Sequence, residues 1–185
     1  MSSWRIYNET DTGNLLFSSH NNLSIHNKLS SAGVRFEQWL TPATLDADAS
    51  QAEVLTAYKE DIERLIAEEG YQSVDVVNMH PKHPQKAELR EKFLSEHTHS
   101  EDEVRFFVAG EGLFSLHIDE KVYEVHCTAG DLISVPANTP HWFDMGPNPS
   151  FIAIRLFNNP DGWVANFTGN NIAEIFNRLD NWGCY

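Results

Sequence analysis

The most informative residues of this chain are two histidines at alternate positions, His97 and His99, and a glutamate four residues after the second, Glu103. Alternate side chains of an extended strand point to the same face, so both imidazoles can reach one point in space. Imidazole nitrogens together with a carboxylate oxygen suit a borderline divalent cation such as iron, nickel, manganese or zinc. The spacing therefore predicts a metal site.

A fourth ligand is available downstream at His141, directly after the turn-rich run 136–140. Three nitrogens and one oxygen around a six-coordinate ion leave two positions for a substrate or dioxygen. The chain contains 9 histidines, so a chance pair on the surface, or a pair satisfied within the protein, is the alternative. The residues around both halves of the set favour the metal site.

Those surroundings form a recognisable pattern. Glu103 is followed at the seventh position by Gly110, and the run Gly-Asp-Leu-Ile-Ser-Val-Pro at 130–136 leads to His141. The arrangement resembles the two-part cupin signature, in which the first part supplies His, His and Glu and the second part supplies the last His.

Two residues depart from that generic signature. Asn138 stands where the second part usually has Gly, and Met145 stands where it often has Asn. Asn tolerates a positive φ better than most residues, so we expect the turn at 138 to be preserved.

Strand parity places further side chains beside the predicted ion. Within the strand that begins at Glu103, Arg105 shares the face of that glutamate. A buried arginine is costly unless it is paired with an anion, so Arg105 either pairs with a core carboxylate or stabilises negative charge on a substrate. Phe143 shares parity with His141 and should line the same pocket, a role compatible with core packing.

Charge and length limit the possible functions. A chain of 185 residues with 41% hydrophobic residues is expected to form one domain with a true core. Lysine and arginine number 13 against 27 aspartates and glutamates, a formal net charge of −14. This balance argues against nucleic acid and against an anionic membrane surface as partners.

The sequence also indicates a compartment. The two cysteines, Cys127 and Cys184, imply no disulfide framework, and we expect a reducing cytoplasm. The N-terminal residues show no apolar signal segment, and no apolar run reaches the length of a membrane helix. We expect a monomer.

The elements that must position the site begin with an edge strand around 4–7 and a strand at 34–39. Ser50 and Glu53 form a capping box, after which apolar residues recur at helical spacing until Gly70 ends the helix. Glu60 and Arg64 are expected to pair on its solvent side. A strand at 73–79, a short helix at 85–94 and a final helix at 172–179 are also predicted.

The body of the chain is rich in short strands separated by turn signals. The expected strands are 104–108, 113–118, 121–126, 132–135, 141–145 and 151–157. This spacing predicts a mainly β fold, a cupin-type antiparallel β-barrel or jelly roll with a few flanking helices. We expect a single cupin-type domain over 1–185, with a helical lead-in at about 50–94, a metal-binding barrel at about 95–157 and a C-terminal tail at 158–185.

Two long segments resemble the acireductone dioxygenase family. These are 93–108 (Phe-Leu-Ser-Glu-His-Thr-His-Ser-Glu-Asp-Glu-Val-Arg-Phe-Phe-Val) and 131–146, which runs from Asp131 to Gly146 through His141. The shorter segments 33–37, 70–73 and 159–163 resemble the same family, so the resemblance covers most of the chain. It is more specific than the generic cupin signature, and no metal ligand of the family motif is missing.

The resemblance implies a reaction of methionine salvage. The implied substrate is the acireductone 1,2-dihydroxy-3-keto-5-methylthiopentene, cleaved with dioxygen. With Fe(II) the family forms 2-keto-4-methylthiobutyrate and formate, and with Ni(II) it forms 3-methylthiopropionate, formate and carbon monoxide. The implied cofactor is therefore one Fe(II) or Ni(II) ion per chain.

The resemblance also implies roles for residues around the ion. Arg105 would stabilise the substrate dianion, and Phe93, Phe143 and Trp163 could form an apolar pocket for the sulfur-containing tail. Glu96 and Asp102 flank the ligands and would tune the site; solvated surface charge is their alternative role.

Two other functions are compatible with the same motif. A cupin can bind a metal and a small ligand without turnover, and a metal-dependent isomerase or decarboxylase can use the same barrel. Oxygen uptake on adding an acireductone distinguishes the dioxygenase from both.

Overall fold

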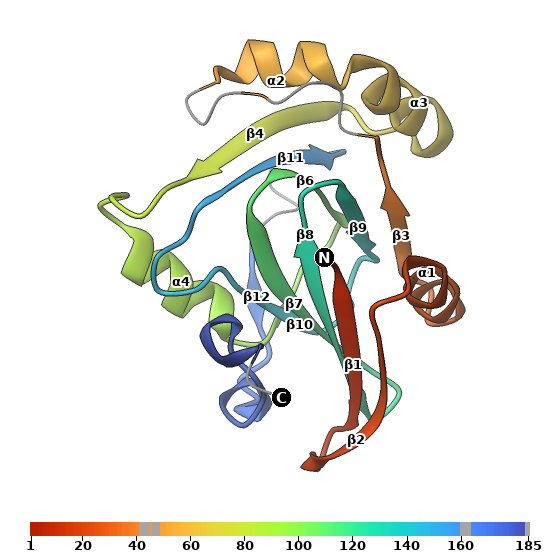
Figure 1. Ribbon diagram of the computed structural model, residues 1–185, viewed down its shortest axis with the longest axis vertical. Coiled ribbons are helices and arrows are strands. Elements are labelled where there is room, and N and C mark those ends of the chain that lie inside the picture. The colour runs from red at the N-terminus through yellow and green to blue at the C-terminus, as the bar shows by residue number, and fades with distance from the viewer. Residues whose placement is uncertain (41–44, 46–48, 160–163, 184–185) are drawn as a thin grey trace.

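The protein is mainly β, with helices on the outer sides of two antiparallel sheets (Figure 1). The computed structural model describes residues 1–40, 45, 49–159 and 164–183. The predicted mainly β architecture with flanking helices is confirmed. The sheets stay separate, each with its own edge strands, so the two-sheet arrangement holds and the closed barrel does not.

The larger sheet has seven strands. Their order across the sheet is β12 (Asn166–Phe167), β5 (His97–Thr98), β10 (His141–Asp144), β7 (Glu111–Ile118), β8 (Lys121–Thr128), β1 (Ser3–Asn8) and β2 (Asp11–Ser19). The five-stranded sheet has the order β3 (Arg35–Gln38), β9 (Asp131–Val135), β6 (Glu103–Ala109), β11 (Phe151–Phe157) and β4 (Ser73–Met79). Every strand predicted in the body of the chain is present, and each end lies within two residues of its predicted position.

Strand β6 is buried on both faces. Phe107 points between the sheets, where its ring meets Phe114 edge-on at 6.5 Å. Phe106 points to the outer face, where its ring stacks on Trp39 at 4.4 Å and meets Tyr58 at 4.8 Å. Both faces of this strand therefore exclude water, which explains its nearly continuous apolar sequence.

The helices are α1 (Asn22–Ser31), α2 (Gln51–Ala57), α3 (Lys59–Glu69) and α4 (Lys86–Leu94). The predicted capping box at Ser50 and the left-handed C-cap at Gly70, φ 80°, are both present. The single helix predicted between them is wrong, because Tyr58 leaves helical geometry at φ −110° and divides it into α2 and α3. Tyr58 is buried against Phe106, so the break between α2 and α3 allows this ring to pack on the sheet. Within the described part of the chain, no helix combines the length and apolar character needed to cross a membrane.

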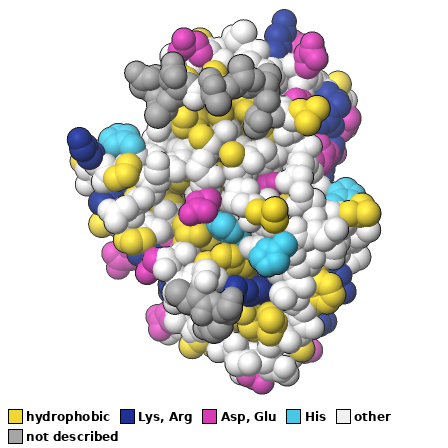
Figure 2. Space-filling model, viewed as in Figure 1, with side chains coloured by type: hydrophobic (Ala, Val, Ile, Leu, Met, Phe, Trp, Pro, Cys, Tyr) yellow, Lys and Arg dark blue, Asp and Glu magenta, His cyan; other side chains and the backbone are white. Residues whose placement is uncertain are grey.

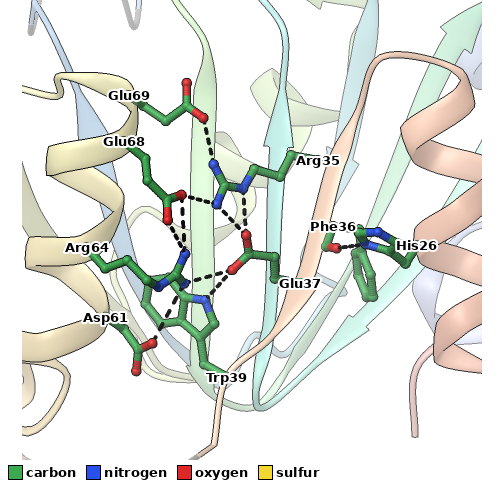
Figure 3. A network of polar contacts seen from close by, with 9 residues as sticks. All are labelled: His26, Arg35, Phe36, Glu37, Trp39, Asp61, Arg64, Glu68 and Glu69. Carbon is green, nitrogen blue, oxygen red and sulfur yellow. Dashed lines mark hydrogen bonds and ion pairs between the residues drawn. The ribbon is translucent and has the colours of Figure 1, made fainter.

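A network of charges fastens α3 to β3 (Figure 3). Arg35 contacts Glu68 and Glu69, and Arg64 donates to Glu37 at 2.9 Å. The predicted pair of Arg64 with Glu60 is not what forms; Arg64 contacts Glu37, Asp61 and Glu68 instead. Its guanidinium turns toward the sheet, where Glu37 is half-buried and so attracts a cation more strongly than a solvated glutamate does. Acidic and basic side chains are intermixed over α3 at the upper right of Figure 2.

Two terminal predictions are corrected. The strand near residues 4–7 is β1, but it lies between β8 and β2, so β2 is the edge strand. The pattern does not predict β2, because almost all of its residues are exposed, nor α1, where only Ile25 and Leu29 are buried.

The helix predicted at 172–179 is also wrong. The segment forms two single-turn 3-10 helices, Ile172–Glu174 and Leu179–Asn181. Its backbone amides bind carboxylates of the sheet: Asn177 donates to Glu124 at 2.9 Å and Leu179 donates to Asp144 at 2.9 Å. Backbone amides that donate to carboxylates of the sheet cannot also donate to helical carbonyls, so a regular helix does not form here.

Glu124 is the buried anchor of this C-terminal segment. Its side chain is fully buried and accepts hydrogen bonds from both the backbone and the side-chain amide of Asn177. Burial raises the pKa of Glu124 from 4.5 to about 7, and the Asn177 hydrogen bonds only partly oppose this effect. The folded state therefore holds a proton here more tightly than the unfolded chain does.

This predicts a pH-dependent stability. Because the folded-state pKa is raised, the contribution of Glu124 is fully present below pH 4.5 and is lost as pH rises through about 7. A shift of this size corresponds to about 3 kcal/mol. Glu124→Gln, which cannot ionise, should therefore gain stability relative to the wild type between pH 5 and 8, measured by urea unfolding. Glu60→Gln, at an exposed position on α3, is the control. A constant difference across this range would contradict the prediction.

Candidate metal centre

Four side chains converge at one end of the space between the sheets. His97, His99, Glu103 and His141 are all buried, and one potential ligand atom from each lies within 4.8 Å of the others. His97 begins β5 and is the register partner of His141 at the start of β10. Glu103 begins β6 in the opposite sheet, so the cluster joins the two sheets.

The histidines are oriented by backbone carbonyls. Nδ1 of His97 lies 2.7 Å from Ser95 O, and Nδ1 of His141 lies 2.8 Å from Thr139 O. Nδ1 of His99 lies 3.3 Å from Val164 O. A carbonyl can only accept, so each Nδ1 carries the proton and each Nε2 is left with a lone pair.

The resulting donor set fits a divalent cation. Nε2 of His141 lies 2.6 Å from Oε2 of Glu103, and Nε2 of His99 lies 3.4 Å from the same oxygen. Two acceptors at 2.6 Å repel each other unless a proton or a metal ion lies between them. A divalent ion bound by the carboxylate and the imidazoles satisfies all of these lone pairs at once.

The protonation states of His97 and Glu103 at neutral pH also favour metal binding. Burial, and then the neighbouring His141, lowers the pKa of His97 to about 4, which keeps its imidazole neutral. Burial alone would raise the pKa of Glu103, but Arg105 and His141 hold it well below 4.5. Neutral imidazole and ionised carboxylate are the forms that bind metals.

The loops that carry the ligands are bound to each other. Asp102 Oδ1 accepts from the backbone amide of Ala137 at 2.9 Å, and the amide of Asn138 donates to His99 O at 2.8 Å. Asn138 has φ 62°, so the expected left-handed turn is confirmed. Asp102, which is partly buried, therefore links the two parts of the motif through this hydrogen bond.

Glu96 is buried, which also excludes solvated surface charge for this residue. Its Oε2 lies 2.8 Å from Nδ1 of His117, and its Oε1 accepts from Thr168 Oγ1 at 2.7 Å. Nε2 of His117 lies 2.6 Å from Glu9. The contacts of Glu96 thus hold the C-terminal segment against the residues that directly precede β5. Sequence reasoning missed His117 and Thr168, which no motif marks.

Arg105 forms the carboxylate pairing that was one of the two interpretations of its strand face. It is buried, and its Nε lies 2.8 Å from Oε1 of Glu103, so it does pair with a core carboxylate. That carboxylate is itself a candidate ligand, which places the guanidinium at the edge of the metal centre. Burial lowers the pKa of Arg105, an effect that Glu103 opposes.

Two of the three aromatic residues predicted for the pocket, Phe93 and Phe143, lie beside Arg105. Its Cζ is 4.7 Å from the ring centre of Phe143 and 5.8 Å from that of Phe93. Trp163 lies outside the described residues. A separate cavity of about 660 Å³ opens between α4 and the C-terminal segment; its lining includes Glu96 and Phe167 but, among the residues described there, none of the four candidate ligands.

A buried cluster of three histidines and one glutamate between two antiparallel sheets defines a cupin-type metal-binding protein. Comparison with known proteins identifies the family within this class. A model of the ARD/ARD′ family matches residues 4–165. The chain therefore belongs to the acireductone dioxygenase family.

Individual relatives agree with this assignment. An acireductone dioxygenase of Alcanivorax borkumensis is 70% identical over 82% of this chain and 83% of its own length. One from Enterobacter sp. (strain 638) is 55% identical over 97% of this chain and 99% of its own. A solved acireductone dioxygenase from Bacillus anthracis, with a cadmium ion in its active centre, is 31% identical, covering 90% of this chain and 98% of its own, with a TM-score of 0.80.

The geometry predicts how ligand loss affects metal binding. His97→Ala and His141→Ala each remove one imidazole from the buried set and should lower the metal content well below one ion per chain. Elemental analysis after dialysis measures this content. His80→Ala, which changes an exposed histidine outside the cluster, should bind as the wild type does. Equal metal content in all three variants would exclude this centre.

Proposed function

We propose that this chain is a metal-dependent acireductone dioxygenase of methionine salvage, acting on 1,2-dihydroxy-3-keto-5-methylthiopentene and dioxygen. The observation that carries the proposal is the buried cluster of three histidines and one glutamate in a chain 52–70% identical to proteins named acireductone dioxygenase. The family match extends over nearly the whole chain and is not confined to the ligands.

His97, His99, Glu103 and His141 are the residues that would hold the ion. A bound Fe(II) or Ni(II) would act as a Lewis acid and favour the deprotonated enediol. Cadmium in the Bacillus anthracis relative supports a metal at this position, and the identity of the metal in this chain is part of our proposal.

Arg105 is the proposed catalytic residue for charge stabilisation. Its guanidinium is buried beside Glu103 and faces the aromatic ring of Phe143. In such a water-poor site a fixed positive charge stabilises an anion much more than it does in bulk water. Arg105 would thus hold the substrate as its dianion, the electron-rich form that reacts with dioxygen.

The apolar end of the substrate requires an apolar wall. Phe143 is buried and Phe93 is half-buried, with ring centres 6.4 Å apart. We assign these two rings, together with Trp163, to the methylthio tail, because thioethers pack favourably against aromatic rings. Glu96 and Asp102 would act indirectly, by fixing the segments that carry the ligands.

The remaining assignments complete the proposal. The Fe(II) form would give 2-keto-4-methylthiobutyrate and formate, and the Ni(II) form 3-methylthiopropionate, formate and carbon monoxide. Both product sets contain every atom of the substrate and of one dioxygen. We propose a cytoplasmic monomer without nucleic-acid or membrane partners, in keeping with the net charge of −14.

Reloading the metal-free protein tests the reaction. With Fe(II), addition of the acireductone should consume oxygen and give the keto acid and formate; with Ni(II), carbon monoxide should appear. An oxygen electrode, gas analysis and chromatography measure these outcomes. Binding without oxygen uptake would instead support a non-catalytic cupin, and conversion without oxygen would support an isomerase or decarboxylase.

Substitution of Arg105 tests the charge assignment. Arg105→Ala should keep the metal but lower the rate by about 10²–10³-fold, the usual cost of removing one electrostatic stabiliser. The spectral shift that marks dianion formation on anaerobic mixing should disappear, and Arg105→Lys should restore only part of it because the fork geometry is lost.

A purely structural Arg105 gives a different result. Arg105→Ala would then lower the melting temperature, while the folded fraction still formed the dianion and turned over at nearly the wild-type rate. Arg64→Ala, in the surface network of α3, is the control for loss of a structural arginine.

A further inference from the structure

Position 112 in β7 requires glycine because a side chain there would collide with a neighbouring ring, and not because of its backbone conformation. A Cβ atom added there would lie 2.4 Å from Cε2 and 2.5 Å from Cζ of Phe143. Real Cβ atoms essentially never approach so closely, so the ring would have to move. The φ angle of Gly112 lies outside the left-handed region, so any residue could adopt this backbone. The constraint on position 112 is therefore the ring of Phe143.

Phe143 in turn contacts the guanidinium of Arg105. Three rings surround this group, which we call the aromatic cage: Phe143 at 4.7 Å from Cζ, Phe114 at 5.6 Å and Phe93 at 5.8 Å. Phe143 is the closest of the three, and its ring is packed against Phe114 at 4.7 Å. The negative faces of the rings attract a cation, most strongly where water is excluded.

The cage and Glu103 restrain the guanidinium together. Nε of Arg105 lies 2.8 Å from Oε1 of Glu103, whose Oε2 faces His141. A ring that moved toward Arg105 would displace the guanidinium from this carboxylate, and with it from the edge of the metal centre.

We propose that Gly112 and Phe143 are positioning residues for Arg105: the absence of a side chain at 112 seats the Phe143 ring against the guanidinium and holds the charge beside Glu103. The inference rests on the proposed function for its catalytic consequence. Its structural part, the dependence of the Arg105 position on residue 112, stands independently of the substrate.

The structural part is tested by NMR on protein loaded with cadmium, the ion in the active centre of the Bacillus anthracis relative. Ring currents should shift the side-chain proton resonances of Arg105 in the wild type. Gly112→Ala should change these shifts, and Phe143→Leu should move them toward the values of an unshielded arginine. Gly13→Ala is the matched control, because Gly13 lies in β2 of the same sheet with room for a Cβ and an ordinary φ. Unchanged Arg105 resonances in both Gly112→Ala and Phe143→Leu would overturn the inference.

The catalytic part is tested by a double-mutant cycle. Phe143→Leu should lower kcat/KM at least about tenfold, because it removes one cation–π contact between desolvated groups and also one of the rings assigned to the substrate tail. Gly112→Ala should lower it in the wild type but have little further effect in the Phe143→Leu background, because the clashing ring is gone. Equal effects of Gly112→Ala in both backgrounds would refute a role through Phe143.

Two further measurements separate a merely structural effect. Metal content should stay at the wild-type level in Gly112→Ala, and the loss should appear in the anaerobic spectral shift of the dianion, which altered packing alone does not remove. If Gly112→Ala does not fold, Phe143→Leu alone decides, by its Arg105 resonances and its spectral shift. Absence of oxygen uptake by the wild type would refute the proposed function while the resonances still test the position of Arg105.

Discussion

The contact between Nε2 of His141 and Oε2 of Glu103 is the constraint on which the rest of the structure depends. The two atoms are buried and 2.6 Å apart, and Nδ1 of His141 already donates to a carbonyl. The two facing atoms can lie this close only with a proton or a metal ion between them. Because β10 and β6 belong to different sheets, the same contact also joins the two sheets where the ligands meet.

Glu103 extends this constraint to Arg105 through its second oxygen. Oε1 pairs with Arg105, so a single carboxylate faces the metal ligands on one side and the guanidinium on the other. The aromatic faces around Arg105 stabilise its charge in addition to the pairing with Glu103. Stability of the core and the proposed chemistry thus depend on the same few side chains.

Local sequence signals predicted the elements whose stability is local. The capping box at Ser50 and the left-handed cap at Gly70 form as expected, because each depends on residues within one turn. Predictions failed where distant residues compete for the backbone. Tyr58 leaves helical geometry to pack on the sheet, and the amides near Asn177 bind Glu124 from another strand in place of a helical carbonyl. Neither partner can be identified from spacing along the chain.

The sequence by itself determined the identity and spacing of His97, His99 and Glu103, since the alternation of strand side chains and the chemistry of imidazole and carboxylate are local properties. Tertiary structure alone decided that Arg105 would contact Glu103 within a ring of phenylalanines, and that Gly112 would leave the space for one of them. The physical reason is that Arg105 lies in β6 while Phe114 and Phe143 lie in strands of the other sheet, and that Gly112 and Phe143 come from the neighbouring strands β7 and β10. The distances of these contacts follow from sheet packing and register, which are collective properties of the fold and are not encoded in any one segment.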